Sequence, residues 1–393
     1  MTVLALALAC GLQLSAQTLW NTGRMAQAKA AYENGDEATV QTGKSIIKKA
    51  DKAMKMPDCS VMDKKRPSAS GDMHDYFSQA RYRWPDPTKP DGRPYINRDG
   101  VSNPEINDLD RPLIGRMSET VQDCALAWYF TGNRGYAVKA ASQVRTWFLD
   151  KATRMNPHFT YAQVSPGHNN DVGNGGGILD GYNMILMLEA VYMLEDNHFL
   201  GKKDMKRLRA WFRELDAWMM SSPQGEYEFA ATNNHSIIMD EQLIAYRIFT
   251  GDLDGAKQLL STLHERRIFP QVEPDGSQPR ELKRTIAFHY SNYNLEHILD
   301  LAFYARSLGM DFFGRESEDG RSISKAIDFL LPYSFKTVED WPWQQIHGWE
   351  GVIENFSQSL YRASLLDPSR SDWREAWLKL HDPKAQDRLY VLF

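Results

Sequence analysis

The feature that most constrains the fold is an internal repeat of helix-turn-helix patterns. The stretch AWYFTGNRGYAVKAASQVRTWF, which begins at Ala127, resembles AYRIFTGDLDGAKQLLSTLHERR, which begins at Ala245. In both, an apolar helical pattern ends in Thr-Gly, then Asn or Asp follows, and a second amphipathic pattern begins. Glycine just past one helix and Asn or Asp as the N-cap of the next allow a very short turn. A looser copy, ARSLGMDFF, begins at Ala305. The repeat predicts antiparallel helix pairs stacked into an (α/α) toroid or a solenoid.

Helical periodicity extends over most of the chain, whereas strand-like alternation is scarce. The 393 residues are enough to bury a large core, and their number would also suit two or three domains. No break in composition separates one part of the chain from another, so we expect residues 17–393 to form one all-α domain. The predicted helices are 36–55, 115–131, 134–151, 178–195, 202–220, 236–250, 254–267, 293–309, 322–332, 354–365 and 371–381.

Two long stretches interrupt the helical pattern. Residues 57–112 are rich in Pro, Gly, Asp and Arg, and residues 155–177 are rich in Asn and Gly. Loops of this length inside a compact domain are usually functional or disordered. Both stretches contain Tyr and His, and the first also contains Trp, which disordered linkers usually lack. We therefore expect ordered walls over a site, with 57–112 as a lid or groove wall.

The N-terminal residues 2–16 have the pattern of a signal peptide. An apolar run too short to span a bilayer is followed by small residues and Gln17. The alternative is a buried N-terminal helix. The first cation is Arg24, so the usual basic segment before the apolar run is missing, which favours a native start upstream of Met1. We expect export across the inner membrane to the periplasm.

Charge and cysteine content exclude several classes of protein. The sequence has 46 Lys and Arg against 51 Asp and Glu, a net charge of −5, whereas general nucleic-acid binding needs a basic field.

After the N-terminal run we expect no membrane span, because no stretch reaches about 18 consecutive apolar residues. Cys59 and Cys124 remain after cleavage, and they form either one bridge or two free thiols.

Two polar constellations stand at expected helix starts. TNNHS at 232–236 precedes an apolar helical run, and it places amides and an imidazole at a helix N-terminus, the end that attracts anions. The alternative is simple N-capping with a surface histidine. Residues 280–293 combine cations, His289 and tyrosines, and a cation beside a phenol lowers its pKa. The alternative here is an amphipathic helix with a solvated basic face and core tyrosines.

Two further clusters are rich in aromatic residues. Residues 72–100 contain Tyr, Trp and several Arg, which suit stacking on sugar rings and bidentate pairing with carboxylates. Residues 341–350 contain three Trp beside a glycine, and these could line a groove. The alternatives are a proline-stiffened loop on the surface for the first cluster and a plug at the edge of the core for the second.

Several motifs are absent from the sequence. There is no P-loop, no GxGxxG after a strand, no HExxH and no CxxC. His74 and Asp75 have no spaced partners for a metal, so we expect no metal and no cofactor. A glycosidase with paired carboxylates stays open, because no pair of Asp or Glu is singled out by its context.

Together, these motifs resemble the alginate-lyase-like polysaccharide lyase superfamily. GDMHDYFSQARYRWPDPTKPDGRPYINRDGVSNPE at 71–105 resembles its N-terminal signature, and NNHS at 233–236 resembles its central motif. ELKR…FHY, ending at Tyr290, resembles its tyrosine segment, and SPGHN at 165–169 leading into GILD is also similar. The best match is the Bacteroidetes-type polysaccharide lyase family 38, with family 5 alginate lyases more distant. The resemblance implies an incomplete (α/α) toroid of about six to seven helix pairs, with the site in a groove at one end.

The resemblance also implies β-elimination on a uronate polymer. Removing the C5 hydrogen beside a carboxylate builds an enolate-like dianion, so fixed donors must neutralise that carboxylate. Asn234, with His235 or Arg284, is expected to supply them. Tyr290 is expected to act as both base and acid when the C5 hydrogen and O4 lie on one face of the sugar ring. When they lie on opposite faces, His235 is expected to act as the base. Glu228 is expected to orient Arg284 or Tyr290.

We expect a monomer that binds an anionic uronate polysaccharide, with alginate as the first candidate. The alternatives are a lyase acting on glucuronan or a glycosaminoglycan, an (α/α) glycoside hydrolase with two carboxylates, and an inactive sugar-binding protein. The expected substrate-binding residues are His74, Tyr76, Arg81, Trp84, Gln163, Asn169, Asn233, Lys283, His289 and Trp349. Because a net charge of −5 repels a polyanion, cations must gather locally. The candidates are Arg81, Arg83, Arg93, Arg98, Arg280, Lys283 and Arg284.

Overall fold

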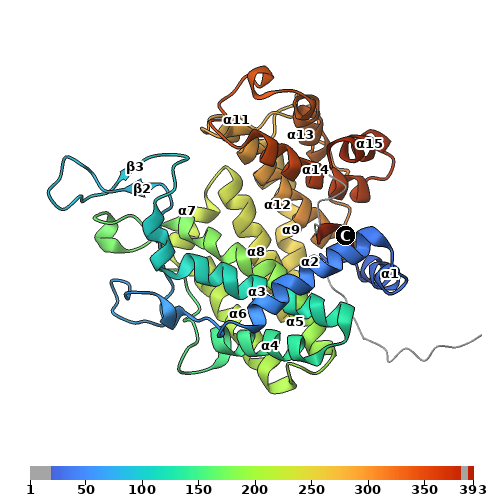
Figure 1. Cartoon of the computed structure of the whole chain (residues 1–393). Coiled ribbons are helices and arrows are strands. Elements are labelled where there is room, and N and C mark those ends of the chain that lie inside the picture. The colour runs from blue at the N-terminus through green and yellow to red at the C-terminus, as the bar shows by residue number, and fades with distance from the viewer. Residues whose placement is uncertain (1–18, 382–387) are drawn as a thin grey trace, which may run out of the picture.

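Helices make up most of the computed structural model, which describes residues 19–381 and 388–393 (Figure 1). The α-helices are α1 (Thr22–Glu33), α2 (Glu37–Met54), α3 (Asp110–Thr131), α4 (Arg134–Val144), α5 (Asn183–Asp196), α6 (Lys202–Ser221), α7 (Pro223–Phe229), α8 (Asn234–Thr250), α9 (Leu253–Leu263), α10 (Phe269–Gln271), α11 (Pro279–Leu282), α12 (Ala287–Ser307), α13 (Ile323–Leu330), α14 (Trp349–Leu366), α15 (Ser371–Leu380) and α16 (Leu389–Leu392). The strands are β1 (Phe77–Gln79), β2 (Arg83–Trp84), β3 (Ile96–Asn97) and β4 (Tyr161–Val164).

The repeated turn forms as its sequence predicts. Helix α3 ends at Gly132, whose φ is 70°, and the side chain of Asn133 caps α4. Helix α8 ends at Gly251, with a φ of 88°, and Asp252 caps α9 in the same way. Both second helices continue into a π-helical turn. The looser copy differs, because a left-handed Gly309 follows α12 but no helix starts directly after it.

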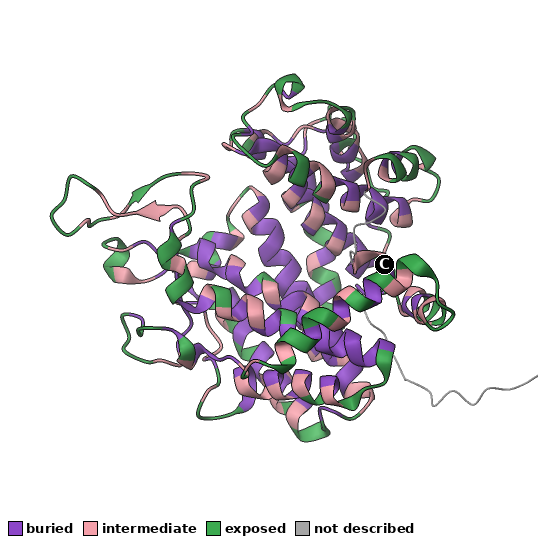
Figure 2. Cartoon of the chain, in the orientation of Figure 1, coloured by how far each residue is buried: buried purple, intermediate pink, exposed green. Residues whose placement is uncertain are grey.

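The helices form an all-α toroid around one apolar core. Helix α3 packs against α4 and α5, α8 packs against α6, α9 and α12, and α12 packs against α14. The main core cluster includes residues from Leu19 to Phe393, and a small separate cluster contains Phe77, Leu109 and Val164. In Figure 2 the buried residues face the inside of the helix assembly. The expected single domain over residues 17–393 stays a prediction. The number of helix pairs stays a prediction.

The two ends of the described chain meet. The backbone N–H of Asn21 donates to the carbonyl of Leu392 at 2.6 Å. The guanidinium of Arg24 donates to the carbonyl of Tyr390 at 2.9 Å, across 366 positions of sequence. Helix α1 therefore packs beside α16, and these two hydrogen bonds join the first and last described helices.

The two long loops are ordered and contain the strands. Strand β1 pairs in parallel with β4, while β2 and β3 form an antiparallel hairpin that projects from the body (Figure 1). The base of the first loop is fixed by the fully buried ion pair between Lys64 and Asp110, whose charged atoms are 3.0 Å apart. Asp110 also accepts the N–H of Phe77. These contacts attach the loop to the start of α3.

Several predictions need correction or stay untested. The sequence did not predict helices α1, α7, α10, α11 and α16, and the helix expected at 293–309 begins already at Ala287. One described stretch, Gly175–Asp196, is long and apolar enough to cross a membrane by length and composition alone, but 72% of its 18-residue apolar segment is buried in the fold. The expected absence of a membrane span stays a prediction. Cys59 and Cys124 are free, buried thiols. The signal-peptide prediction falls at 2–16, outside the described residues.

Candidate active site

A cavity of about 910 Å³ lies where the loops meet the starts of α8 and α12. All four residues expected to be catalytic line it: Asn234, His235, Arg284 and Tyr290. Arg81, Gln163, Asn233 and His289, expected to bind substrate, line it too. A second cavity, near the chain ends between α1 and α15, contains none of the candidates.

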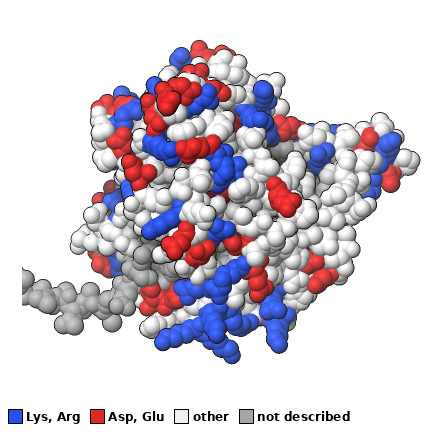
Figure 3. All heavy atoms as spheres, turned by 180° about the vertical axis from the view of Figure 1, so that it is seen from behind, with Lys and Arg blue, Asp and Glu red and all other residues white. Residues whose placement is uncertain are grey.

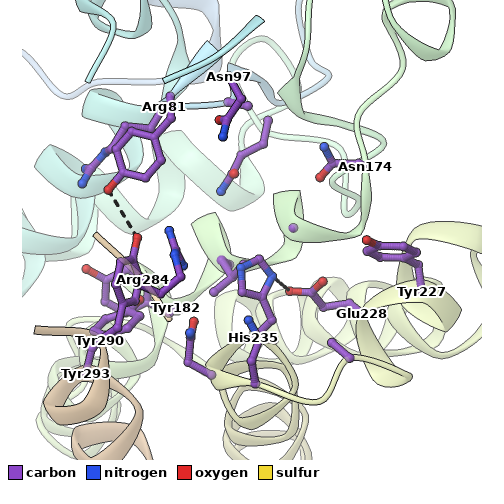
Figure 4. Close-up of a pocket in the computed structure, with 18 of the residues that line it drawn as sticks. Arg81, Asn97, Asn174, Tyr182, Tyr227, Glu228, His235, Arg284, Tyr290 and Tyr293 are labelled. Carbon is purple, nitrogen blue, oxygen red and sulfur yellow. Dashed lines mark hydrogen bonds and ion pairs between the residues drawn. The ribbon is translucent and has the colours of Figure 1, made fainter. Parts of the chain in front are cut away.

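His235 lies in the first turn of α8 and is held by a buried carboxylate. Its Nδ1 is 2.7 Å from Oε1 of Glu228, whose side chain is fully buried on α7 (Figure 4). A carboxylate at Nδ1 keeps the ring proton there, so Nε2 is left as the basic nitrogen. The imidazole is 32% exposed and lines the cavity, so a substrate can reach it. Glu228 thus orients His235, not Arg284 or Tyr290 as expected.

Asn234 is fixed by two hydrogen bonds to one buried carboxylate. Its backbone N–H donates to Oε1 of Glu281 at 2.8 Å, and its Nδ2 donates to Oε2 at 2.7 Å. Burial raises the pKa of Glu281, while these two bonds act in the opposite direction. The side-chain amide is therefore oriented at the cavity wall before any substrate arrives, as electrostatic preorganisation requires.

Tyr290 lies in the first turn of α12, beneath a guanidinium. The Arg284 guanidinium carbon is 3.7 Å from the centre of the Tyr290 ring, and Nη2 pairs with Asp99 at 2.8 Å. The phenol oxygen is 3.3 Å from that of Tyr82, which belongs to the first long loop. Burial raises the pKa of Tyr290, and the charge of Arg284 offsets only part of this rise. The phenol is therefore protonated in the free protein and ready to act as an acid.

A buried carboxylate behind the cavity lining organises a further set of side chains. Asp180 accepts hydrogen bonds from Tyr76 at 3.0 Å and from Gln163 at 3.0 Å, and it lies 3.5 Å from Arg111. Gln163 and Arg111 line the cavity, and Gln163 has a φ of 48°, which is uncommon for a residue other than glycine. Asp180 thus holds one amide and one cation in place at the site.

A scan against family models matches residues 60–341 to the model described as alginate lyase. That match covers well over half of the chain. The chain belongs to the alginate lyase family. A crystal structure of an alginate lyase from Bacteroides ovatus is 40% identical and superposes with a TM-score of 0.92, covering 95% of this chain and 98% of that one.

More distant alginate lyases share the fold. A variant of alginate lyase A1-III complexed with tetrasaccharide has a TM-score of 0.57 at 14% identity, covering 94% of each chain. No curated protein sequence matches the chain. The family and the fold named by the sequence resemblance are therefore confirmed, while the assignment to polysaccharide lyase family 38 stays a prediction.

Within this alginate lyase fold, Tyr76 and Trp349 lie away from the cavity lining. Tyr76 is completely buried and donates to Asp180, so it supports the site from below and cannot contact a polymer. The ring of Trp349 packs on Phe288 with centroids 5.2 Å apart, and its Nε1 donates to the carbonyl of Lys336. In both cases the aromatic residue contributes to the core, and sequence alone could not distinguish this from sugar stacking.

Four more residues expected to bind substrate do not line the cavity. Nδ1 of His74 bonds the carbonyl of Arg154, and Nε1 of Trp84 donates to the carbonyl of Val101. Asn169 and Lys283 are exposed outside the lining. These four residues therefore lie outside the cavity lining, and their part in substrate binding stays a prediction.

The cations gather only in part as expected. Arg81, Arg83 and Arg284 line the cavity, together with Arg111, which has no local sequence signal. Arg93 instead pairs with Asp171 at 2.5 Å, Arg98 lies over the ring of Trp84, and Arg280 and Lys283 lie outside. Figure 3 shows acidic and basic side chains interspersed on the opposite face, with Lys and Arg gathered at its lower edge. The charge on that face is therefore mixed rather than uniformly acidic.

A buried cluster of ionisable groups lies behind the cavity. Glu241, His297 and Asp300 bring possible metal-ligand atoms within 4.8 Å of one another, and His297 packs on the cavity residue Tyr293. Burial raises the pKa of Glu241 to about 8 and that of Asp300 to about 7. These carboxyls therefore bind protons near neutral pH, which reduces the charge of the cluster without an ion. The absence of a metal requirement stays a prediction.

Replacing Glu228 with Gln is expected to lower kcat/KM by about 10²-fold, because the neutral amide no longer fixes the His235 ring proton on Nδ1. The measurement is turnover of a uronate polymer, with circular dichroism to verify the fold. Glu226→Gln, an exposed change on the same helix, is the control and should leave turnover within about twofold. Equal activity of the two variants would contradict the role of Glu228.

Proposed function

We propose that this protein cleaves alginate by β-elimination at the cavity around His235 and Tyr290. The observation that carries the proposal is the placement of a carboxylate-held imidazole and a protonated phenol on one cavity that also contains arginines and a fixed amide. The alginate lyase from Bacteroides ovatus, 40% identical over nearly the whole chain, supports alginate as the substrate.

The first chemical requirement is neutralisation of the substrate carboxylate. Asn234 is already oriented by Glu281, and Arg284 and Arg111 each retain partial exposure beside their carboxylate partners. Donors fixed in this way stabilise the charge that develops on the carboxylate when C5 loses its proton. They act without reorganisation at the moment of reaction.

The second requirement is a base and an acid. A base removes the C5 proton, the C–H electron pair forms the C4=C5 double bond, and the O4 bond breaks as the acid protonates the leaving oxygen. Nε2 of His235 serves as base and Tyr290 as acid when the two groups lie on opposite faces of the ring. When they share a face, Tyr290 first releases its proton to solvent, and the charge of Arg284 stabilises the phenolate. The phenolate then takes the C5 proton, and the phenol so formed donates that proton to the leaving O4.

The cavity does not favour the glycoside hydrolase alternative. Such an enzyme needs two carboxyl groups facing the scissile bond. Among the described residues that line the cavity, Glu228 is the only Asp or Glu, and it is fully buried against His235. A lyase mechanism with His235 and Tyr290 needs no pair of catalytic carboxyl groups.

The test is an assay of purified protein on polymannuronate, polyguluronate and glucuronan in parallel, with and without chelator. The proposal expects ultraviolet absorbance from the unsaturated product on at least one alginate polymer, unchanged by chelator. Absorbance on glucuronan alone would overturn the substrate but keep the chemistry. New reducing ends without absorbance would overturn the lyase assignment.

We also propose that the protein acts as an exported, periplasmic monomer. The support is the signal-like composition of residues 2–16 and one main apolar core in the described residues. The proposed reaction uses side chains of one chain only.

A further inference from the structure

We propose that Tyr227 and Asn174 form a sugar-binding subsite at the end of the cavity remote from Tyr290. In Figure 4, Tyr227 lies on the far side of His235 and Glu228 from Tyr290 and Arg284. Both Tyr227 and Asn174 line the cavity. The ligand is one pyranose ring of a uronate polymer, next to the ring that reacts. This inference rests on the proposed function and assigns a place to a second sugar.

The exposure of Tyr227 is the first support. Its side chain is 69% exposed, more than any other large hydrophobic side chain in the described part of the chain. Leaving an aromatic ring in water forgoes the free energy that burial would provide. Single exposed apolar side chains are common on protein surfaces, so it is the position of this ring on the cavity wall that points to a ligand.

The glycine run at 175–177 is the second support. A Cβ at Gly175 would lie 2.3 Å from Cδ1 of Tyr227, which is closer than such atoms approach. A Cβ at Gly176 would lie 3.2 Å from Cε1 of His235. The same loop backbone therefore packs directly against the Tyr227 ring and against the imidazole. The position of the subsite is thus fixed relative to the base.

The chemistry at this end suits a sugar ring more than a carboxylate. Tyr227 offers a flat apolar face to the C–H groups of a pyranose. Asn174 is exposed, and its amide can both donate to and accept from hydroxyl groups. In Figure 4, Arg81 and Arg284 lie towards the Tyr290 end. The polymer is therefore held by charge around the reacting ring and by stacking at the neighbouring ring.

The experiment compares Tyr227→Ala with Tyr227→Phe on alginate polymer. Loss of the ring is expected to raise KM about 3- to 10-fold, with a smaller change in kcat, because the sugar then loses the flat apolar face that it packs against. The Phe variant keeps the ring and should stay within about twofold of the wild type in KM. Phe335→Ala, which removes a 51% exposed ring outside the cavity lining, is the matched control.

The outcomes separate this inference from the proposed function. Unchanged KM in an active Tyr227→Ala variant overturns the subsite and leaves the lyase assignment intact. An equal rise of KM in Phe335→Ala also overturns the subsite, because loss of an exposed ring outside the cavity would then have the same effect. Wild-type protein that forms no unsaturated product on any uronate polymer overturns the proposed function itself. A KM rise confined to Tyr227→Ala supports the subsite.

Discussion

Replacing Tyr290 with Phe is expected to lower kcat on alginate by about 10³-fold or more, because general acid–base groups contribute roughly 10²–10⁴-fold. The variant keeps the aromatic ring that packs under Arg284 and removes only the hydroxyl that faces Tyr82. Tyr290 donates the proton to the leaving oxygen in both geometries, so cleavage of mannuronate and guluronate linkages should fall together. The measurement is the initial rate of double-bond formation at saturating polymer.

A nearby tyrosine provides the control. Tyr293 lies one turn further along α12, lines the cavity, and is packed edge-on against His297. Tyr293→Phe should change kcat by less than about threefold, because its hydroxyl has no assigned part in proton transfer. A Tyr290→Phe variant that is as active as Tyr293→Phe would refute the tyrosine mechanism.

Replacing Asp240 with Ala is expected to cost about 3–5 kcal/mol of unfolding free energy, the usual penalty for breaking a buried ion pair by removing one partner. Asp240 on α8 is fully buried and pairs with Arg266 at 2.9 Å and Arg267 at 2.6 Å. The change leaves both guanidinium groups without this carboxylate. Urea or guanidinium unfolding measures the loss.

An exposed ion pair provides the comparison for Asp240. Glu265 and Arg315 pair on the surface, with side chains 57% and 44% exposed, and solvent screens such pairs. Glu265→Ala should therefore change stability by less than about 1 kcal/mol. If Asp240→Ala lost as little unfolding free energy as Glu265→Ala, the buried network would contribute little to stability. Arg267 also donates to the carbonyls of Phe229 and Ala231, so the Asp240 change should loosen the link between α7 and α8 that positions His235.

The parts of the fold that depend on neighbouring residues could be predicted from sequence. The turns after Gly132 and Gly251 need only a left-handed glycine and a capping side chain, and both signals are local. Likewise, Asn234 and His235 stand together at a helix start, where the sequence pattern places them. Family resemblance, rather than spacing, linked these residues with Tyr290 and Arg284.

The start of α12 could not be predicted, because its cap comes from a distant segment. Ile286 makes no side-chain cap bond. Instead the N–H of Ala287 donates to the carbonyl of Gln344, and the N–H of Phe288 donates to Oε1 of Gln345. This cap places Tyr290 in the first turn of the helix, at the cavity. The role of Asp180 depends in the same way on partners far along the chain, such as Tyr76, and no local pattern indicates it.

The meeting of α1 with α16 has a consequence for biosynthesis. Contacts between segments 366 positions apart form only after nearly all of the chain has left the ribosome. Until then the face of α1 that contains Met25 and Ala28 lacks its contacts with α16 and stays partly exposed to solvent. Closing so large a loop is slow compared with forming the local helix pairs. We therefore expect the nascent chain to assemble its middle helices first and to depend on chaperones until the two ends join.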